Sequence, residues 1–316
     1  MSKKLISVVV PCYNESEALP YFFDELEKVI KSMPDYDFEA IYVDDGSKDN
    51  TLEIIRSRAE KDPVTRYVSF SRNFGKEAGM LAGLRATKGD YAVIMDADLQ
   101  DPPSLLPDMM KLLEEKECDS VATRRGNRKG EPPIRSLFAN CFYGIINRIS
   151  KVKMTPAARD YRLMTRRMVD AVLSLSEYNR FSKGIFSWVG FKTEWISYSN
   201  VERVAGKTKW SFWGLFKYSI ECIVAFSTVP LNVSSFSGFV LFLLSILGAI
   251  GIIVRKIVDV SSSVDGWAST ICVILFVGGI QLLCIGILGQ YLSKTYLETK
   301  HRPDYIVAET EEDIRK

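Results

Sequence analysis

Two long stretches without a charged residue constrain the fold of this 316-residue chain more than any other feature. They cover Cys222–Val254 and Gly266–Ser293. Each is longer than the roughly 20 residues that a helix needs to cross the hydrocarbon core of a bilayer. We therefore predict membrane-spanning helices over residues 236–254 and 269–292. Buried helices of a globular core are the alternative, which two such stretches in tandem disfavour.

The charges around these stretches predict their orientation. Basic residues lie on the outer flanks of the two predicted spans: Lys207, Lys209, Lys217, Lys294, Lys300 and Arg302. The linker 255–265 carries two basic and two acidic residues. Because cytoplasmic flanks are enriched in Lys and Arg, we expect a multi-pass protein of the inner (cytoplasmic) membrane with both termini in the cytoplasm. A net charge of +2 argues against a dedicated nucleic-acid-binding protein.

The segment before the spans alternates between two kinds of pattern. Runs rich in β-branched and aromatic residues predict strands over residues 5–10, 38–43, 66–70 and 91–95. Apolar residues at helical spacing predict helices over residues 15–32, 49–60 and 76–86. This alternation predicts an α/β fold with a mostly parallel sheet flanked by helices on both faces. In such sheets, ligands bind at the carboxyl ends of the strands.

Polar residues follow three of these predicted strands. Their sequences are Pro11-Cys12-Tyr13-Asn14-Glu15, Asp44-Asp45-Gly46-Ser47 and Asp96-Ala97-Asp98-Leu99-Gln100. A turn after a strand explains each one alone, since Asp and Asn are common there. Together they predict a site at one edge of the sheet. In that site Asp96 and Asp98 would supply oxygen ligands of the kind that Mg²⁺ and Mn²⁺ favour.

Cysteine and histidine exclude other kinds of chemistry. The six cysteines show no Cys-x-x-Cys spacing, so we expect small apolar residues in a reducing compartment, with no zinc site and no disulfide framework. His301 is the only histidine. Catalytic triads that need histidine, and metal sites with several histidines, are therefore excluded.

The strand ends also carry a resemblance to a known family. Four segments resemble motifs of family-two inverting glycosyltransferases with the GT-A fold: Val10–Glu15, Val43–Ser47, Ser71–Lys76 and Asp96–Pro103. Within that family the chain is similar to polyprenyl-phosphate glycosyltransferases. These include bactoprenol glucosyltransferases, dolichol-phosphate mannose synthases and undecaprenyl-phosphate aminoarabinose transferases. Arg159–Met164 and Arg203–Trp210, followed by two spans, extend the resemblance over nearly the whole chain.

The resemblance implies roles for the residues at the strand ends. The nucleotide-sugar pocket would be lined by Pro11, Tyr13, Glu15, Asp45 and Asp96. Asp45 would accept a hydrogen bond from the base of a uridine or guanosine diphosphate. Asp96, Asp98 and Gln100 would hold a divalent metal, Mg²⁺ or Mn²⁺, on the diphosphate.

The resemblance also implies residues for catalysis and for the lipid phosphate. Asp160 occupies the position of the family's catalytic aspartate and would act together with Asp98. Basic residues would bind the phosphates: Arg124, Arg135, Arg203 and Lys209. Ala139 stands where relatives often have a hydroxyl-bearing residue, so we expect no contact there. A phosphate monoester is mostly dianionic at neutral pH, so Asp160 is either a general base or a group that orients the acceptor.

These inferences divide the chain into four parts. They are a cytoplasmic GT-A catalytic domain (1–210), an interfacial amphipathic segment (211–229), a transmembrane hairpin (230–293) and a cytoplasmic tail (294–316). The basic loop 124–135 is interpreted as a lid that captures the acceptor or the membrane surface, with a solvated charged face as the alternative.

The expected reaction transfers one sugar to a polyprenyl phosphate such as undecaprenyl phosphate, and glucose from UDP-glucose is the favoured donor. N-acetylhexosamine, mannose from a GDP donor and aminoarabinose stay open, because hydroxyl contacts in the pocket decide among sugars. A processive polysaccharide synthase would carry a Gln-x-x-Arg-Trp motif, which this chain lacks. The intact Asp96-x-Asp98 disfavours a non-enzymatic membrane scaffold. Glycines in the spans would permit close helix packing, so a homo-oligomer is one expectation.

Overall fold

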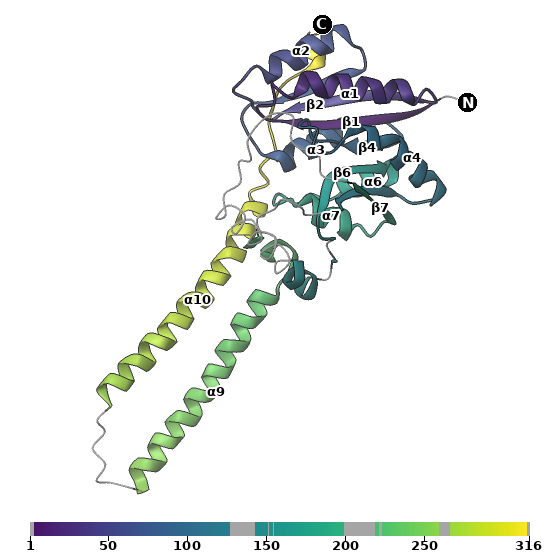
Figure 1. The fold of residues 1–316 in the computed structure, drawn as a ribbon. Helices are drawn as coiled ribbons and strands as arrows, with labels where there is room; N and C mark the ends of the chain where they lie inside the picture. The colour runs from purple at the N-terminus through teal and green to yellow at the C-terminus, as the bar shows by residue number, and fades with distance from the viewer. Residues whose placement is uncertain are drawn as a thin grey trace.

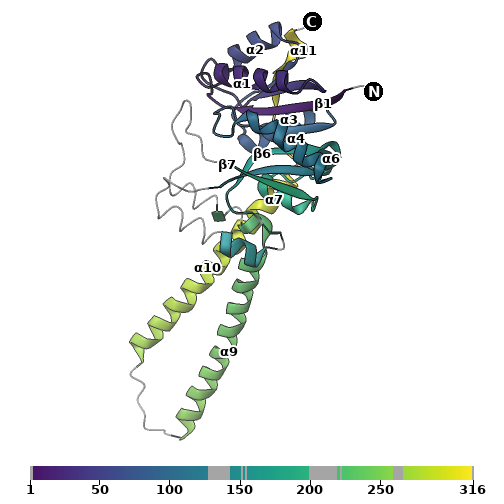
Figure 2. The same ribbon diagram turned by 45° about the vertical axis from the view of Figure 1, so that its right-hand side comes forward.

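The computed structural model describes residues 3–126, 143–150, 152–153, 155–198, 219–220, 223–258 and 266–314. A sheet covered by helices forms one end of the molecule, and two long helices project from it (Figure 1). The same arrangement is seen after the molecule is turned by 45° (Figure 2). The predicted α/β fold, with a sheet flanked by helices and followed by two apolar helices, is confirmed.

The sheet has eight strands in the order β7-β5-β6-β4-β1-β2-β3-β8. The strands are β1 (Lys4–Cys12), β2 (Tyr36–Asp44), β3 (Thr65–Phe70), β4 (Tyr91–Ile94), β5 (Ser120–Arg125), β6 (Ala158–Thr165), β7 (Thr193–Tyr198) and β8 (Val307–Thr310). The four central strands β4, β1, β2 and β3 are parallel. Strand β6 is antiparallel to β4 and β5, and β8 is antiparallel to β3. Strands β5 and β7 at one edge are again parallel, so the sheet is mixed.

Helices cover both faces of the sheet. The described helices are α1 (Leu19–Ser32), α2 (Thr51–Lys61), α3 (Lys76–Ala86), α4 (Leu106–Glu115), α6 (Arg166–Leu173), α7 (Ser182–Trp188), α9 (Val229–Val258), α10 (Trp267–Thr299) and α11 (Glu311–Ile314), with a 3-10 turn at Pro103–Leu105 (η1). Residues 143–149 are also helical.

Alternate residues of β1 show how the two faces are filled. Val8 and Val10 join a core with residues of α1, α2 and α4, whereas Val9 joins a core with residues of α3, α6 and α7. Helix α3 lies close to the sheet because Gly83 has no side chain. A Cβ there would lie 2.2 Å from Cγ1 of Val9. One turn nearer the start of α3, a Cβ on Gly79 would lie 3.3 Å from Cβ of Pro11, so the helix also approaches the carboxyl edge of β1 closely.

The C-terminal segment returns to the sheet, which the sequence patterns did not predict. After α10 the chain runs back along the sheet and its helices, and its end lies beside α2 (Figure 1). The backbone N–H of Ser71 donates to Ile306 O at 3.0 Å, and Tyr305 stacks on Phe70 with ring centroids 4.8 Å apart. Arg56 forms an ion pair with Glu309. Part of the predicted cytoplasmic tail is thus the edge strand β8.

Helices α9 and α10 expose apolar side chains along their length. Within the described residues, two helices are long and apolar enough to cross a membrane, over Val229–Gly248 and Val273–Thr299. Phe236 is 68% exposed and Leu282 is 71% exposed, which excludes a role as buried core helices. An apolar surface of this extent indicates association with a membrane. The predicted boundaries of the four parts of the chain stay predictions.

An ion-pair network joins the C-terminal segment to the sheet, and it gives a test of the fold. Arg66 lies 2.7 Å from Glu39 and 2.7 Å from Glu311, and all three side chains are largely buried. We expect Arg66→Met to lower the free energy of unfolding by about 3 kcal/mol, because two buried carboxylates lose their cation. Thermal and denaturant unfolding of the detergent-solubilised protein would measure the loss.

The control for this prediction is Lys31→Met. Lys31 forms an exposed pair with Glu27, one turn away on α1. Exposed pairs contribute little to stability, so this variant is expected to unfold almost as the unmodified protein does. An equal effect of the two substitutions would contradict the assigned role of Arg66.

Candidate active site

The loops that follow β1 and β2 are joined to each other by hydrogen bonds. The backbone N–H of Asn14 donates to Ser47 Oγ at 3.0 Å, and the N–H of Lys48 donates to Asn14 Oδ1 at 2.8 Å. The N–H of Glu15 donates to Thr51 Oγ1 at 2.8 Å. Asn14 has a φ of 54°, a left-handed conformation that Asn tolerates better than most residues. These bonds bring the first two predicted strand ends into one wall.

A cavity of about 290 Å³ opens beside this wall. Residues of all three predicted strand ends, of the segment before α3 and of its first turn line it: Pro11, Cys12, Tyr13, Glu15, Asp45, Asn73, Gly75, Lys76, Gly79, Asp96, Ala97 and Asp98. The prediction that these strand ends meet at one edge is confirmed. The individual roles expected for Pro11, Tyr13, Glu15, Asp45, Asp96 and Asp98 stay predictions.

Asp45 holds the segment that leads into α3. Its carboxylate accepts hydrogen bonds from the backbone N–H of Phe74 at 2.6 Å and of Gly75 at 2.9 Å. Gly75 has a φ of 98°, a conformation that only glycine adopts easily. Burial raises the pKa of Asp45, and the two backbone hydrogen bonds oppose that rise. In this structure Asp45 positions the start of α3, and its expected contact with a base stays a prediction.

Lys76, the first residue of α3, joins two of the predicted carboxylates. Its ammonium group lies 2.7 Å from Asp96 Oδ1 and 2.7 Å from Asp160 Oδ2. Desolvation opposes the charge of Lys76, but the carboxylates of Asp160 and Asp96 raise its pKa overall. Desolvation likewise opposes the charge of Asp160, yet Lys76 and Lys183 lower its pKa overall. Asp160 is therefore ionised at neutral pH, and so is Lys76.

Asp98 and Gln100 lie on the strained turn after β4. Asp98 is largely buried and accepts a hydrogen bond from the N–H of Gln100 at 3.1 Å. Leu99 between them has a φ of 57°, which costs energy for a residue with a Cβ. Gln100 Oε1 accepts from Arg159, whose guanidinium also lies 2.9 Å from Asp101. The expected role of Gln100 as a metal ligand stays a prediction.

The donor set can be compared with what a divalent metal needs. Among the described residues, no group of three or more His, Cys, Asp or Glu side chains could hold a metal ion. Asp96 and Asp98 nevertheless line the same cavity, two residues apart at the end of one strand. Mg²⁺ commonly takes only one or two carboxylates from a protein and completes its ligands with phosphate oxygens and water. The two carboxylates fit such a metal when a diphosphate is bound.

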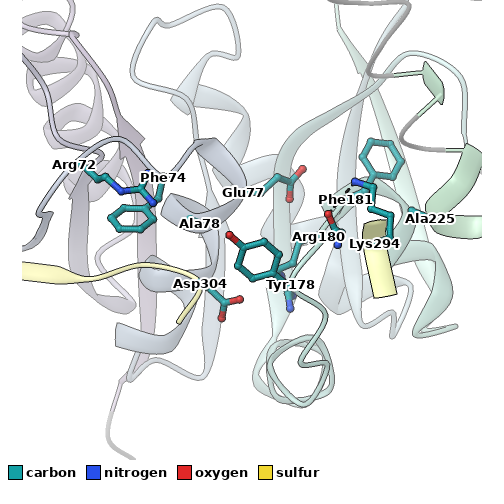
Figure 3. A pocket seen from close by; sticks show the side chains of 11 residues that line it. Arg72, Phe74, Glu77, Ala78, Tyr178, Arg180, Phe181, Ala225, Lys294 and Asp304 are labelled. Atoms are coloured by element: carbon teal, nitrogen blue, oxygen red, sulfur yellow. Dashed lines mark hydrogen bonds between the residues drawn. The ribbon is translucent and has the colours of Figure 1, made fainter. Parts of the chain in front are cut away.

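A second cavity lies on the other side of the segment 72–78. Its volume is about 270 Å³, and Figure 3 shows the side chains around it. Residues of α3, α10 and the segment before α7 line it, including Glu77, Phe181 and Lys294. Burial raises the pKa of Glu77 to about 7, and the nearby Asp160 adds to that rise although hydrogen bonds from Ser182 oppose it.

The predicted phosphate-binding residues are only partly described. Arg124, at the end of β5, is exposed and donates to Ser197 Oγ at 2.9 Å. It does not line the cavity that holds Asp96 and Asp98. Arg135, Arg203 and Lys209 lie outside the described residues, as do Ala139 and most of the basic loop. Among the described residues, the structure therefore brings the predicted carboxylates to one cavity, whereas Arg124 does not line that cavity.

Two lysines and one glutamate at this site were not among the predicted residues. Lys76 ends the segment Ser71–Lys76, which carried the family resemblance but received no role. Lys183 lies 3.9 Å from Asp160. Glu77 accepts hydrogen bonds from Ser182. Lys76 could have been found from its position at the start of a helix that faces the carboxyl edge, whereas no sequence signal marks Lys183.

The comparisons with known proteins agree with this geometry. The family model described as glycosyl transferase family 2 matches residues 7–173. The chain is 42% identical over 309 residues to the putative glycosyltransferase CsbB of Bacillus subtilis, covering 98% of this chain and 93% of that protein. It is 40% identical over 304 residues to the bactoprenol glucosyl transferase of Shigella phage SfX, covering 96% and 98%. The chain belongs to glycosyl transferase family 2, and it is a glycosyltransferase with a GT-A-like sheet.

Solved structures are more distant. The mannosyltransferase PcManGT from Pyrobaculum calidifontis, solved in complex with GDP-Man and Mn²⁺, aligns with a TM-score of 0.45 at 16% identity. The alignment covers 94% of this chain and 86% of that one.

The ion pairs of Lys76 give a test of the site. We expect Lys76→Met to lower kcat/KM for sugar transfer by about 100-fold, since two close carboxylates are left without their cation. The pKa of Asp160 should rise in this variant, so the acidic limb of the pH–rate profile should move to higher pH. Initial rates measured between pH 5 and about 9 would show both effects.

The matched control is Lys111→Met. Lys111 lies on α4 with its side chain 73% exposed, and it pairs only loosely with Glu115 at 3.8 Å. Its removal should leave the rate and the pH profile unchanged. If Lys76→Met behaved like this control, the ion pairs would have no part in the reaction.

Proposed function

We propose that this protein transfers a single sugar from a nucleoside diphosphate to the phosphate of a membrane polyprenyl phosphate, with inversion at the anomeric carbon. The observation that carries the proposal is the cavity in which Asp96, Asp98 and Lys76 meet at the carboxyl edge of the sheet. Relatives that match over nearly the full chain and are described as bactoprenol glucosyl transferases support this acceptor class. Their description also favours glucose, and we infer UDP-glucose as the donor.

A divalent metal, Mg²⁺ or Mn²⁺, would be held by Asp96 and Asp98 together with oxygens of the donor diphosphate. When bound, it would neutralise charge on the diphosphate leaving group as a Lewis acid. Lys76 supplies a second positive charge at the same edge, because its ammonium group lies 2.7 Å from Asp96. The protein thus collects positive charge where the departing diphosphate would gain negative charge.

The acceptor needs little help from a base. A phosphate monoester has a second pKa of about 6 and is mostly dianionic at neutral pH, so it is already a nucleophile. Asp160 is a weak base in this environment, because Lys76 and Lys183 lower the pKa of its carboxyl group. We therefore infer that Asp160 orients these two cations and excludes a competing anion, and that it does not remove a proton from the acceptor.

The apolar helices would place the reaction at the membrane surface. We propose that α9 and α10 cross the cytoplasmic membrane as a hairpin, with the catalytic domain and both termini in the cytoplasm. The basic flanks of the two apolar stretches support this orientation. The predicted basic residues Arg124, Arg135, Arg203 and Lys209 belong to the proposal as contacts of the lipid phosphate.

The proposal is tested by assaying the purified full chain with polyprenyl phosphate in detergent and a panel of nucleotide sugars. We expect release of nucleoside diphosphate and, by mass spectrometry, a lipid that carries one hexose, with UDP-glucose as the preferred donor. A metal contributes several kcal/mol to such a transfer, so Asp98→Asn or chelation should lower the rate by about 100-fold or more.

Asp108→Asn is the control for this experiment, because Asp108 is an exposed carboxylate on α4. It should transfer sugar at the unmodified rate. Equal, slow release of diphosphate by the unmodified protein and by Asp98→Asn would refute the enzyme proposal. A lipid with several sugars would indicate a processive synthase instead.

A further inference from the structure

Helices α3 and α7 meet at their first turns through one carboxylate. Glu77 Oε2 accepts a hydrogen bond from the backbone N–H of Ser182 at 3.0 Å and another from the Ser182 hydroxyl. Figure 3 shows the carboxylate of Glu77 directed toward the segment that carries Arg180 and Phe181. A backbone N–H at the start of a helix has no partner within the helix, so an outside acceptor fixes that end of α7.

The residues next to this contact both reach Asp160. Lys76 precedes Glu77 and lies 2.7 Å from Asp160 Oδ2. Lys183 follows Ser182 and lies 3.9 Å from Asp160 Oδ1. Glu77 and Ser182, which form the hydrogen bonds, are therefore each adjacent in sequence to one of the two lysines that flank the Asp160 carboxylate. A shift of α7 relative to α3 would change the distance from Lys183 to Asp160, because Lys183 lies on α7 whereas Lys76 lies on α3.

The other end of the same segment is attached to α10. The carboxylate of Glu298 accepts from the N–H of Tyr178 at 3.0 Å and of Asn179 at 3.2 Å. Lys294 donates to Asn179 Oδ1 at 2.8 Å. The segment 178–183 thus runs from the end of an apolar helix to the predicted catalytic aspartate. Polar contacts hold it at both ends.

Packing alone does not hold this segment. The cavity of about 270 Å³ lies against Tyr178, Asn179, Arg180 and Phe181, so these residues have open space on one side. A void removes the van der Waals contacts that would otherwise oppose a small displacement. Phe181 packs against Phe226, and Arg180 donates to Leu175 O, but on the side of the cavity the hydrogen bonds that Glu77 and Glu298 accept supply the restraint.

We propose that Glu77 is a positioning residue, which acts through Ser182 to hold Lys183 beside Asp160 during sugar transfer. The inference rests on the proposed function, because sugar transfer is the reaction that is measured. The restraint on Ser182 rests only on its observed hydrogen bonds to Glu77. Glu77 lines the second cavity and does not line the one that holds Asp96 and Asp98. Its removal should therefore affect transfer more than donor binding.

The test compares Glu77→Leu, Glu77→Gln, Lys183→Met and the double variant Glu77→Leu with Lys183→Met. A misplacement of about 1 Å can cost 100-fold in rate, so Glu77→Leu should lower kcat by roughly 10- to 100-fold. The KM for the nucleotide sugar should stay within about twofold, because uniform binding is not lost. Glu77→Gln keeps an acceptor oxygen for Ser182 and should retain most of the activity.

The double variant separates positioning from stability. If Glu77 acts through Lys183, the double variant should be no slower than Lys183→Met alone, since contacts in one pathway are not additive. Multiplying losses would mean that Glu77 acts independently of Lys183 and would overturn the proposal. An unchanged kcat in folded Glu77→Leu would also overturn it.

A second readout does not depend on the reaction. Hydrogen–deuterium exchange of the full chain in detergent should show faster exchange over residues 178–188 in Glu77→Leu but not in Glu77→Gln. If exchange there is unchanged in Glu77→Leu, the restraint is absent and the proposal fails. If the unmodified protein transfers no sugar to any acceptor, the proposed function fails, while the exchange result still decides whether Glu77 holds the segment.

Glu39→Gln is the matched control for both measurements. Glu39 is also a buried carboxylate that accepts from a serine hydroxyl, that of Ser7 at 2.6 Å. It lies on β2 far from Asp160 and lines neither cavity. This variant should keep kcat and the exchange of residues 178–188 unchanged, even if it lowers stability.

Discussion

One ammonium group between two carboxylates determines the charge of the catalytic edge. Lys76 contacts Asp96, which follows β4, and Asp160, which lies on the neighbouring antiparallel strand β6. Without the cation, two carboxylates on adjacent strands would raise each other's pKa and one would tend to protonate. A lysine in the first turn of a helix is itself unfavourable, because the helix dipole places positive potential there. Lys76 and the two carboxylates therefore stabilise each other's charges. Asp45 holds the loop before α3 and so places Lys76 between Asp96 and Asp160.

Much of the fold and half of the site could be predicted, because they depend on patterns within short segments of the sequence. Helix α3 begins at Lys76 and ends at Ala86, as the apolar spacing predicts. Parallel strands start from the same end of a sheet, so Asp45, Asp96 and Asp98 had to meet once the strands were recognised. The two apolar stretches identify themselves by length and by the absence of charge.

The parts that escaped prediction depend on contacts between distant segments. Strand β8 is only four residues long and contains Glu309, so neither length nor alternation marks it. It pairs with β3, and Arg56 and Arg66, about 250 positions earlier, bind Glu309 of β8 and Glu311, which follows it. Lys183 and Glu77 meet Asp160 and Ser182 only after β6 and α7 are packed against α3. Such pairings follow from topology, and one chain without its fold does not reveal them.

The return of the chain after α10 has a mechanical consequence. A domain that is connected to a membrane anchor by one chain segment can rotate about that segment in any direction. A domain connected by two separate segments can rotate only about the line that joins them. Here the sheet is connected covalently to the apolar hairpin twice. One connection is the chain that precedes α9, and the other is Lys300–Ile306, which joins α10 to β8. Seven residues span at most about 25 Å, so the second connection is short. In the proposed membrane arrangement, the hairpin therefore sets the height and tilt of the cavity that holds Asp96 and Asp98. A change in bilayer thickness that tilts α10 would then tilt the sheet with it.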